Sequence, residues 1–166
     1  MNKHKTNWLS RFTFVLLLLL YSIQSATIFH HQDGVARYVT LGFIVVGTLG
    51  LNYTIIKSIF SIFKSRQPIK QLYKEYLWVF GIALLNICMF ASFYQMFGIC
   101  SDGERIKGDW YNSLYFSIVT WTTLGYGDFS PVACLRFVAA LEAVMGYIYM
   151  ALLVGLLLNL SHHSMD

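Results

Sequence analysis

Apolar and polar positions fall into long blocks along the chain. A helix needs about 20 apolar residues to span the roughly 30 Å hydrocarbon core of a bilayer. Four blocks reach or approach this length: residues 12–29, 38–63, 76–98 and 132–160. Together they predict an all-α membrane protein with four transmembrane helices in a lipid bilayer, the first two forming a peripheral hairpin.

The first block has a second interpretation. Basic residues precede its apolar run, and the small residues Ser25 and Ala26 follow it. A cleavable signal peptide has the same arrangement. Both interpretations give the later helices the same orientation, so the choice does not change the rest of the topology.

Composition supports a membrane location and indicates the orientation. Hydrophobic residues make up 57% of the chain and charged residues 12%, about half the charged fraction of a typical soluble domain. The net charge of +4 is too small and scattered to indicate a nucleic-acid partner. Basic residues gather at the N-terminus and between the second and third blocks, and Lys and Arg favour the cytoplasmic side. We therefore expect a plasma or bacterial inner membrane protein with both termini in the cytoplasm.

The connection between the third and fourth blocks contains an apolar run that is too short to cross the bilayer. Asp109 is a suitable helix N-cap, and the following WYNSLYFSIVTWT carries no charge. This run predicts a half-membrane helix over 110–122, and the TLGYGD that ends the segment predicts a re-entrant loop. Backbone that is not helical at membrane depth is tolerated only where it is buried in protein or lines a water-filled path. The loop is therefore expected to line such a path.

The two glycines of this loop indicate what the path conducts. A cation crossing hydrocarbon needs fixed dipoles in place of its hydration shell, and backbone carbonyls can supply them. Successive carbonyls point the same way when right- and left-handed conformations alternate, and Gly125 and Gly127 are spaced for the left-handed positions. One strand cannot surround an ion, so several copies must meet on an axis.

A resemblance to a known family rests on these residues. TTLGYGD (residues 122–128) resembles the selectivity-filter signature of potassium channels, usually written TVGYG, with Leu124 in place of the commoner valine. The preceding SLYFSIVTWT is similar to the pore helix of that family, and residues 135–146 are similar to its inner helix with a hinge glycine. The resemblance covers roughly residues 76–160. It implies a homotetramer, because the signature occurs once, with K⁺ as the permeant ion and no cofactor.

The resemblance also implies roles for the filter segment, which we define as residues 123–128. Its carbonyls would bind K⁺ at Thr123, Leu124, Gly125 and Tyr126, and Gly127 would complete the ion-binding segment and form the outer mouth with Asp128. Asp128 would accept a hydrogen bond from Tyr115 or Trp110; a solvated carboxylate at the mouth is the alternative. The Tyr126 side chain would brace against pore-helix aromatics. Thr122 would support the filter at the end of the pore helix, whose negative dipole end would face a central cavity.

Glu142 is the acid inside a predicted span, and a buried charge in a membrane is costly unless it is paired or neutral. We expect it to support the filter by a hydrogen bond to a pore-helix hydroxyl such as Thr120, and its protonation stays open. Packing without a role in gating is the alternative.

Residues after Glu142 are candidates for the gate. Gly146 would be the hinge of the inner helix, with simple close packing as the alternative. Tyr147, Met150 and Val154 fall on one helical stripe, which would face the axis as an apolar gate or else face lipid or another subunit.

These interpretations divide the chain into residues 1–75, an N-terminal segment with a peripheral hairpin, and residues 76–166, a pore domain. The pore domain would contain an outer helix, a pore helix, the filter segment and an inner helix at 76–98, 110–122, 123–128 and 132–160. Cys100 and Cys134 are expected as free thiols, although inward rectifier channels have a disulfide across a similar region.

The predicted function is passive, K⁺-selective conduction. No span has a basic residue at every third position, and only SHHSMD follows the last block, so we expect neither a voltage sensor nor a cytoplasmic ligand-binding domain. A weakly selective monovalent cation channel and a non-conducting accessory subunit are the alternatives. An enzyme is not expected, because no nucleophile–base pair or metal cluster is visible.

Overall fold

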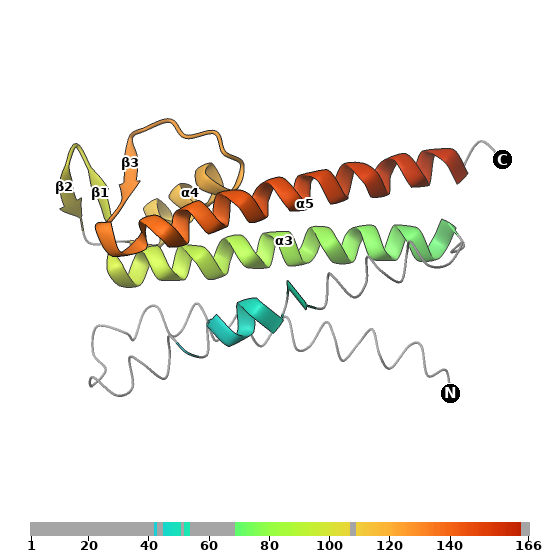
Figure 1. The fold of residues 1–166 in the computed structure, drawn as a ribbon, viewed down its shortest axis with the longest axis horizontal. Coiled ribbons are helices and arrows are strands. Elements are labelled where there is room, and N and C mark those ends of the chain that lie inside the picture. The colour runs from blue at the N-terminus through green and yellow to red at the C-terminus, as the bar shows by residue number, and fades with distance from the viewer. Residues whose placement is uncertain (1–41, 43–44, 51, 54–68, 107–108, 164–166) are drawn as a thin grey trace.

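A computed structural model of the chain describes residues 42, 45–50, 52–53, 69–106 and 109–163 (Figure 1). The first predicted span, most of the second and the first part of the basic link after it lie outside the described residues. The two later spans are present as long helices.

Helices α3 (Ile69–Phe97) and α5 (Arg136–His163) run antiparallel, side by side (Figure 1). Within the described part of the chain, they are the helices long and apolar enough to cross a membrane, over Leu72–Phe97 and Ala133–Leu158. Each apolar stretch has 26 residues and is about 39 Å long at 1.5 Å per residue, enough to cross the hydrocarbon core. The outer helix begins at Ile69 instead of the predicted Tyr76, so it takes in part of the predicted link.

The short helix α4 (Trp110–Trp121) packs against both long helices. Asp109 caps its N-terminus, because the Asp109 carboxylate accepts a 2.7 Å hydrogen bond from the Asn112 backbone amide. The helix ends close to the predicted boundary, with Thr122 as its C-cap.

The all-α prediction omitted a small antiparallel sheet, ordered β2-β1-β3. Its strands are β1 (Ile99–Ser101), β2 (Glu104–Ile106) and β3 (Phe129–Pro131). Asp102 and Gly103 form the turn between β1 and β2, with φ of 52° and 81°. An Asp-Gly pair at positive φ favours a tight hairpin, so the signal was present in the sequence. The sheet joins the end of α3 to the residues that follow the filter segment.

Gly98 ends α3 and allows the sheet to begin directly. Its φ is 81°, and its backbone amide donates a 2.8 Å hydrogen bond to the Tyr94 carbonyl. A Cβ at this position would lie 2.7 Å from the Ile106 carbonyl oxygen. Only glycine combines this left-handed conformation with such a close approach of β2.

The inner helix begins later than predicted, through a 3₁₀ turn, η2 (Ala133–Leu135), that leads into α5. Cys100 and Cys134 flank the filter segment and are both free thiols, as is Cys88. No disulfide joins Cys100 to Cys134.

The two spans differ in how much of their surface the chain itself covers. In the most apolar part of α3, 61% of the residues are buried inside the protein, whereas in the most apolar part of α5 only 22% are buried.

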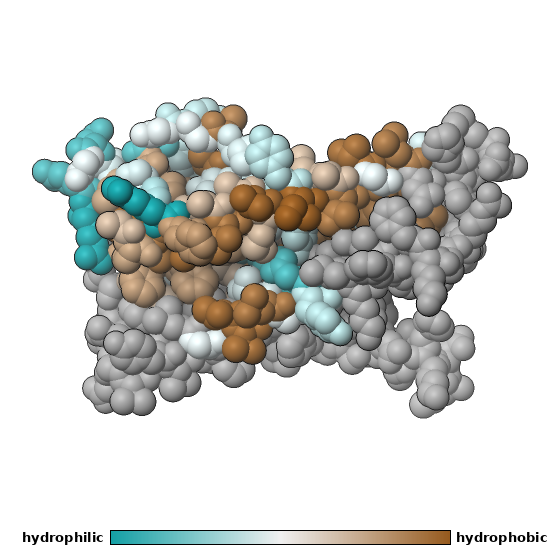
Figure 2. Space-filling model, in the orientation of Figure 1, coloured by the Kyte–Doolittle hydropathy of each residue, from teal (hydrophilic) through white to brown (hydrophobic). Residues whose placement is uncertain are grey.

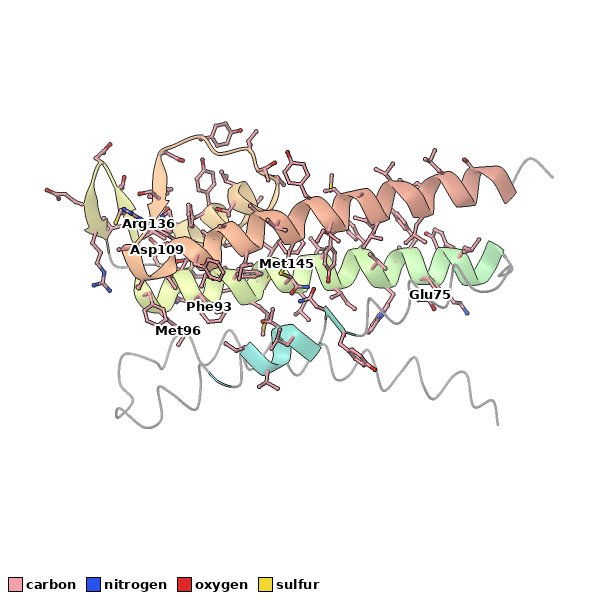
Figure 3. All side chains as sticks on the ribbon, in the orientation of Figure 1. Glu75, Phe93, Met96, Asp109, Arg136 and Met145 are labelled. Carbon is pink, nitrogen blue, oxygen red and sulfur yellow. The ribbon has the colours of Figure 1, made fainter. Side chains whose placement is uncertain are left out.

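Side chains of the two long helices are distributed along their whole length. Met145 lies between α5 and α3, Phe93 and Met96 lie toward the sheet end of α3, and Glu75 lies toward its other end (Figure 3). Figure 2 shows hydrophobic residues along the helices and hydrophilic residues at the end that carries the β-hairpin. The exposed large apolar residues in the described part of α5 are Phe137, Leu141, Val144, Tyr147, Ile148, Met150, Val154, Leu157 and Leu158.

Candidate functional site

The filter segment has an alternating backbone. Thr123, Gly125 and Gly127 have φ of 55°, 55° and 83°, while none of the residues between them has a positive φ. The two glycines occupy left-handed positions, as the spacing predicted. Thr123 also occupies a left-handed position. The sequence did not predict this, because β-branched residues rarely adopt this conformation. A non-glycine residue held there stores about 1–3 kcal/mol of backbone strain, so the surrounding contacts must maintain it.

The two filter glycines are required by conformation and not by lack of space. A Cβ added at Gly125 or Gly127 would meet nothing within 4 Å in a single chain. The neighbouring side chains are also open, with Leu124 56% and Tyr126 67% exposed. A single chain therefore leaves this segment uncovered.

The outer end of the filter segment is fixed by Asp128. The Tyr115 hydroxyl donates a 2.8 Å hydrogen bond to one carboxylate oxygen, and the Phe129 backbone amide donates a 3.0 Å bond to the other. Of the two donors that the resemblance suggested, Tyr115 is the one in contact. The hydrogen bond to Asp128 raises the pKa of the Tyr115 phenol, since ionisation would break the bond and place a second negative charge there.

Aromatic rings reinforce this outer contact. The Tyr115 and Tyr126 rings are parallel within 5° at a centroid distance of 6.5 Å. The Tyr115 ring also meets Phe129 edge to face, at 5.8 Å. Tyr126 thus lies against a pore-helix aromatic, and α4, the filter segment and β3 meet at Tyr115.

The inner end of the filter segment continues directly from α4. The Thr122 amide donates to the Ile118 carbonyl and the Leu124 amide to the Val119 carbonyl, both at 3.0 Å. The Thr123 hydroxyl donates a 2.7 Å bond to the Thr122 carbonyl. The negative end of the α4 dipole therefore lies beside Thr122 and Thr123, where it favours a cation.

Gly146 lies against the end of α4. A Cβ at residue 146 would be 1.9 Å from the Trp121 carbonyl oxygen, a distance that no side chain could occupy. The structure therefore supports the interpretation that Gly146 allows close packing of α5 against α4. Helix α5 continues on both sides of Gly146. The hinge stays a prediction.

Glu142 lies one turn before Gly146 and is 0% exposed. Its two carboxyl oxygens lie 2.5 Å from the Ser117 hydroxyl of α4 and 2.5 Å from the Tyr94 hydroxyl of α3. The pore-helix hydroxyl is therefore Ser117 and not the predicted Thr120. Ser117 is one turn before Trp121, whose carbonyl oxygen lies against Gly146 of α5, so Ser117 lies on the α4 face that meets α5.

A polar network that sequence reasoning missed lies further along α5. The Tyr149 hydroxyl donates a 2.8 Å bond to the Asn52 amide oxygen and accepts a 3.2 Å bond from the Asn86 amide. The Asn52 amide also lies 3.3 Å from the Asn86 amide oxygen. Two asparagines within apolar blocks were the available signal, because polar side chains in membrane helices bond across helices.

The stripe of Tyr147, Met150 and Val154 lies on the uncovered side of α5. These side chains are 69%, 54% and 51% exposed. The structure therefore leaves the stripe available to an axis, a lipid or another subunit. Within the described residues, no group of three or more His, Cys, Asp and Glu side chains could hold a metal ion.

Comparison with known proteins adds to this geometry. A sequence model of a family described as "Ion channel" matches residues 82–161. Residues 82–161 belong to this ion channel family. The matched region contains most of α3, all of α4 and the filter segment, and nearly all of α5, so the ion-channel assignment covers the site described above. An ion channel family is not an enzyme class, and the matched region together with the two long apolar helices indicates a membrane protein.

Two relatives match a shorter part of the chain. Protein LctB of Geobacillus stearothermophilus is 46% identical over 43 residues, and Protein LctB of Bacillus caldotenax is 44% identical over 43 residues. Each match covers 26% of this chain and 32% of the relative, so the chain spans about a third of the length of the curated relatives it matches. No solved structure matches the chain.

Proposed function

We propose that the chain is one subunit of a homotetrameric channel that conducts K⁺ passively. The observation that carries this proposal is the alternating backbone of Thr123, Gly125 and Gly127 within a region of the ion channel family. Such alternation aims successive carbonyls in one direction, and rings of carbonyls replace the hydration shell of K⁺. Conduction needs no covalent chemistry and no cofactor, only the electrochemical gradient.

The exposed surfaces support an assembly of several copies. The filter segment is exposed along its whole length, and the apolar side of α5 next to it is uncovered. One filter segment offers carbonyls on a single side of an ion, so encirclement requires copies of the chain around a common axis. Four copies would enclose the ion and cover part of the exposed α5 surface.

Selectivity for K⁺ over Na⁺ is the finer part of the proposal. Because Leu124 stands where related filters more often have valine, a weakly selective cation pore is the second candidate. A non-conducting accessory subunit is less well supported, because the open space around Gly125 gives no packing reason for a glycine there.

Ion flux in liposomes tests the proposal. The native chain should release trapped K⁺ much faster than Na⁺, and Gly125→Ala should abolish the selective flux because alanine is strained at φ of 55°. Gly81→Ala is the matched control, since Gly81 is a helical glycine of α3 whose added Cβ meets nothing within 4 Å. Equal K⁺ and Na⁺ flux would favour the weakly selective pore. Native-like flux in Gly125→Ala would contradict the filter assignment.

A further inference from the structure

Helices α3, α4 and α5 meet at Glu142, and the hydrogen bonds there indicate the protonation state of its carboxyl group. The Tyr94 hydroxyl of α3 donates to Glu142 Oε2, and the Ser117 hydroxyl oxygen of α4 lies 2.5 Å from Glu142 Oε1. The same Ser117 oxygen lies 2.8 Å from the Ile87 carbonyl oxygen of α3. Ser117 therefore has two oxygen neighbours within hydrogen-bond distance.

The two hydrogen bonds at Ser117 need two protons, and the Ser117 hydroxyl has only one. A hydroxyl carries a single proton, so it can donate to the Ile87 carbonyl or to Glu142 but not fully to both. A backbone carbonyl has no proton to give. The second hydrogen bond can be made only if Glu142 supplies the proton, and a carboxyl group donates only when it is a neutral acid. The unbroken chain then runs from Tyr94 to Glu142, from Glu142 to Ser117 and from Ser117 to the Ile87 carbonyl.

Among the described residues, no buried cation is available to stabilise an ionised Glu142 carboxylate. The buried polar residues of the described part of the chain are Asn86, Ser92, Ser113, Ser117 and Glu142, and none of them is a cation. Among the described side chains in hydrogen-bond contact with Glu142, only Tyr94 can titrate. An unpaired buried charge is far more costly than a hydrogen-bonded neutral acid.

We propose that Glu142 is held as a neutral carboxylic acid that donates its proton to Ser117 and so positions α4 between α3 and α5. The part of this proposal that concerns conduction rests on the proposed function. Glu142 and Gly146 are one turn apart on α5, and they contact Ser117 and Trp121, which are one turn apart on α4. α5 thus holds the pore helix at two successive turns, immediately before the filter segment begins.

Infrared spectroscopy tests the proton without reference to flux. The full chain in liposomes should show a C=O stretching band of a protonated carboxyl group at neutral pH, and Glu142→Gln should remove it. Absence of any protonated-carboxyl band that depends on Glu142 would overturn the proposal. The infrared band does not depend on conduction, so it tests the protonation of Glu142 even if native liposomes show no K⁺ flux. Absence of K⁺ flux would contradict the proposed function and not the protonation of Glu142.

A matched pair of serines tests the positioning of α4. Ser113 and Ser117 are both fully buried on α4, one turn apart, but the Ser113 hydroxyl has no hydrogen-bond partner among the described residues. Ser117→Ala should lower the ratio of K⁺ to Na⁺ flux about fivefold, the effect of losing roughly one hydrogen bond, whereas Ser113→Ala should not. Equal behaviour of the two variants would refute the positioning role.

The pH dependence of K⁺ flux distinguishes a proton-donating Glu142 from one that only fills space. Native flux should fall on the alkaline side as Glu142 loses its proton, because Ser117 must then donate to the buried carboxylate and loses its hydrogen bond to the Ile87 carbonyl. Glu142→Gln carries an amide that can donate to Ser117 and cannot ionise, so its alkaline decline should be absent. Identical pH profiles for the native chain and Glu142→Gln would contradict the proposal.

Discussion

Gly146 of α5 and the carbonyl oxygen of Trp121 on α4 approach so closely that a Cβ at residue 146 would lie 1.9 Å from that oxygen. The inner helix and the end of the pore helix therefore touch backbone to backbone. This contact explains why α5 carries a glycine at this position without invoking a bend.

Replacing Gly146 by alanine should destabilise the protein. The added methyl must push α4 away from α5, and overpacking of a core typically costs about 1–3 kcal/mol. Thermal unfolding of the protein in lipid or detergent measures the loss. Gly155→Ala is the control, because Gly155 lies on the same helix with open space around it. Equal unfolding temperatures for the two variants would show that the backbone contact is not maintained in the bilayer.

Removing the Tyr115 hydroxyl should loosen the outer end of the filter segment. Tyr115→Phe keeps the ring that stacks on Tyr126 but loses the bond to Asp128. We expect a several-fold lower ratio of K⁺ to Na⁺ permeability in reversal-potential measurements. Tyr111→Phe controls for a lost hydroxyl, because Tyr111 is on the same helix and 84% exposed. A native permeability ratio in Tyr115→Phe would argue against support of the filter by this bond.

The same bond should persist through moderately alkaline pH. The ordinary pKa of a tyrosine is 10.0, and the bond to Asp128 raises the pKa of Tyr115 in the folded protein. A raised folded-state pKa means that the contribution to stability is complete below pH 10 and disappears only as pH rises through the higher value. Ultraviolet titration of native protein against Tyr115→Phe should show one phenol that ionises above the ordinary range. A Tyr115 that ionises at or below pH 10 would contradict the contact.

The Tyr149 network should stabilise the packing of α5 against α3 and the segment that contains Asn52. Tyr149→Phe removes the hydroxyl that bonds to Asn52 and Asn86. The expected loss is about 1 kcal/mol, typical of hydrogen bonds between membrane helices. Chemical or thermal unfolding measures it, with Tyr73→Phe, an exposed tyrosine of α3, as the control. If both variants unfold alike, the network contributes nothing measurable.

Gly98 should tolerate substitution less well than Gly103. Both have φ of 81°, but only at Gly98 does an added Cβ meet a backbone atom, the Ile106 carbonyl oxygen at 2.7 Å. Alanine should therefore cost about 1–2 kcal/mol at Gly103 from backbone strain alone and more at Gly98. Unfolding temperatures of the two variants give the comparison. A smaller effect at Gly98 would mean that β2 does not pack over the end of α3.

Local sequence rules predicted the parts of the pore region whose causes lie within a few residues. The Asp109 cap and the helix from Trp110 follow from an N-cap residue before an uncharged run, and the left-handed positions of Gly125 and Gly127 follow from the absence of a Cβ. The hairpin at Asp102–Gly103 could also have been predicted, but its strands are only three residues long and alternate too briefly to show a period.

Relationships between distant segments were decided by the tertiary structure. The acid at residue 142, two glycines and an aromatic-rich short helix are visible in the sequence alone, together with the two long apolar spans. Which pore-helix hydroxyl contacts Glu142, and that Gly146 meets the Trp121 carbonyl, depend on the rotation and depth at which α4 packs between α3 and α5. Hydrophobic periodicity defines a face about 100° wide, whereas hydrogen bonds and backbone contacts require positions within a fraction of an ångström. That precision arises only when the three helices pack together.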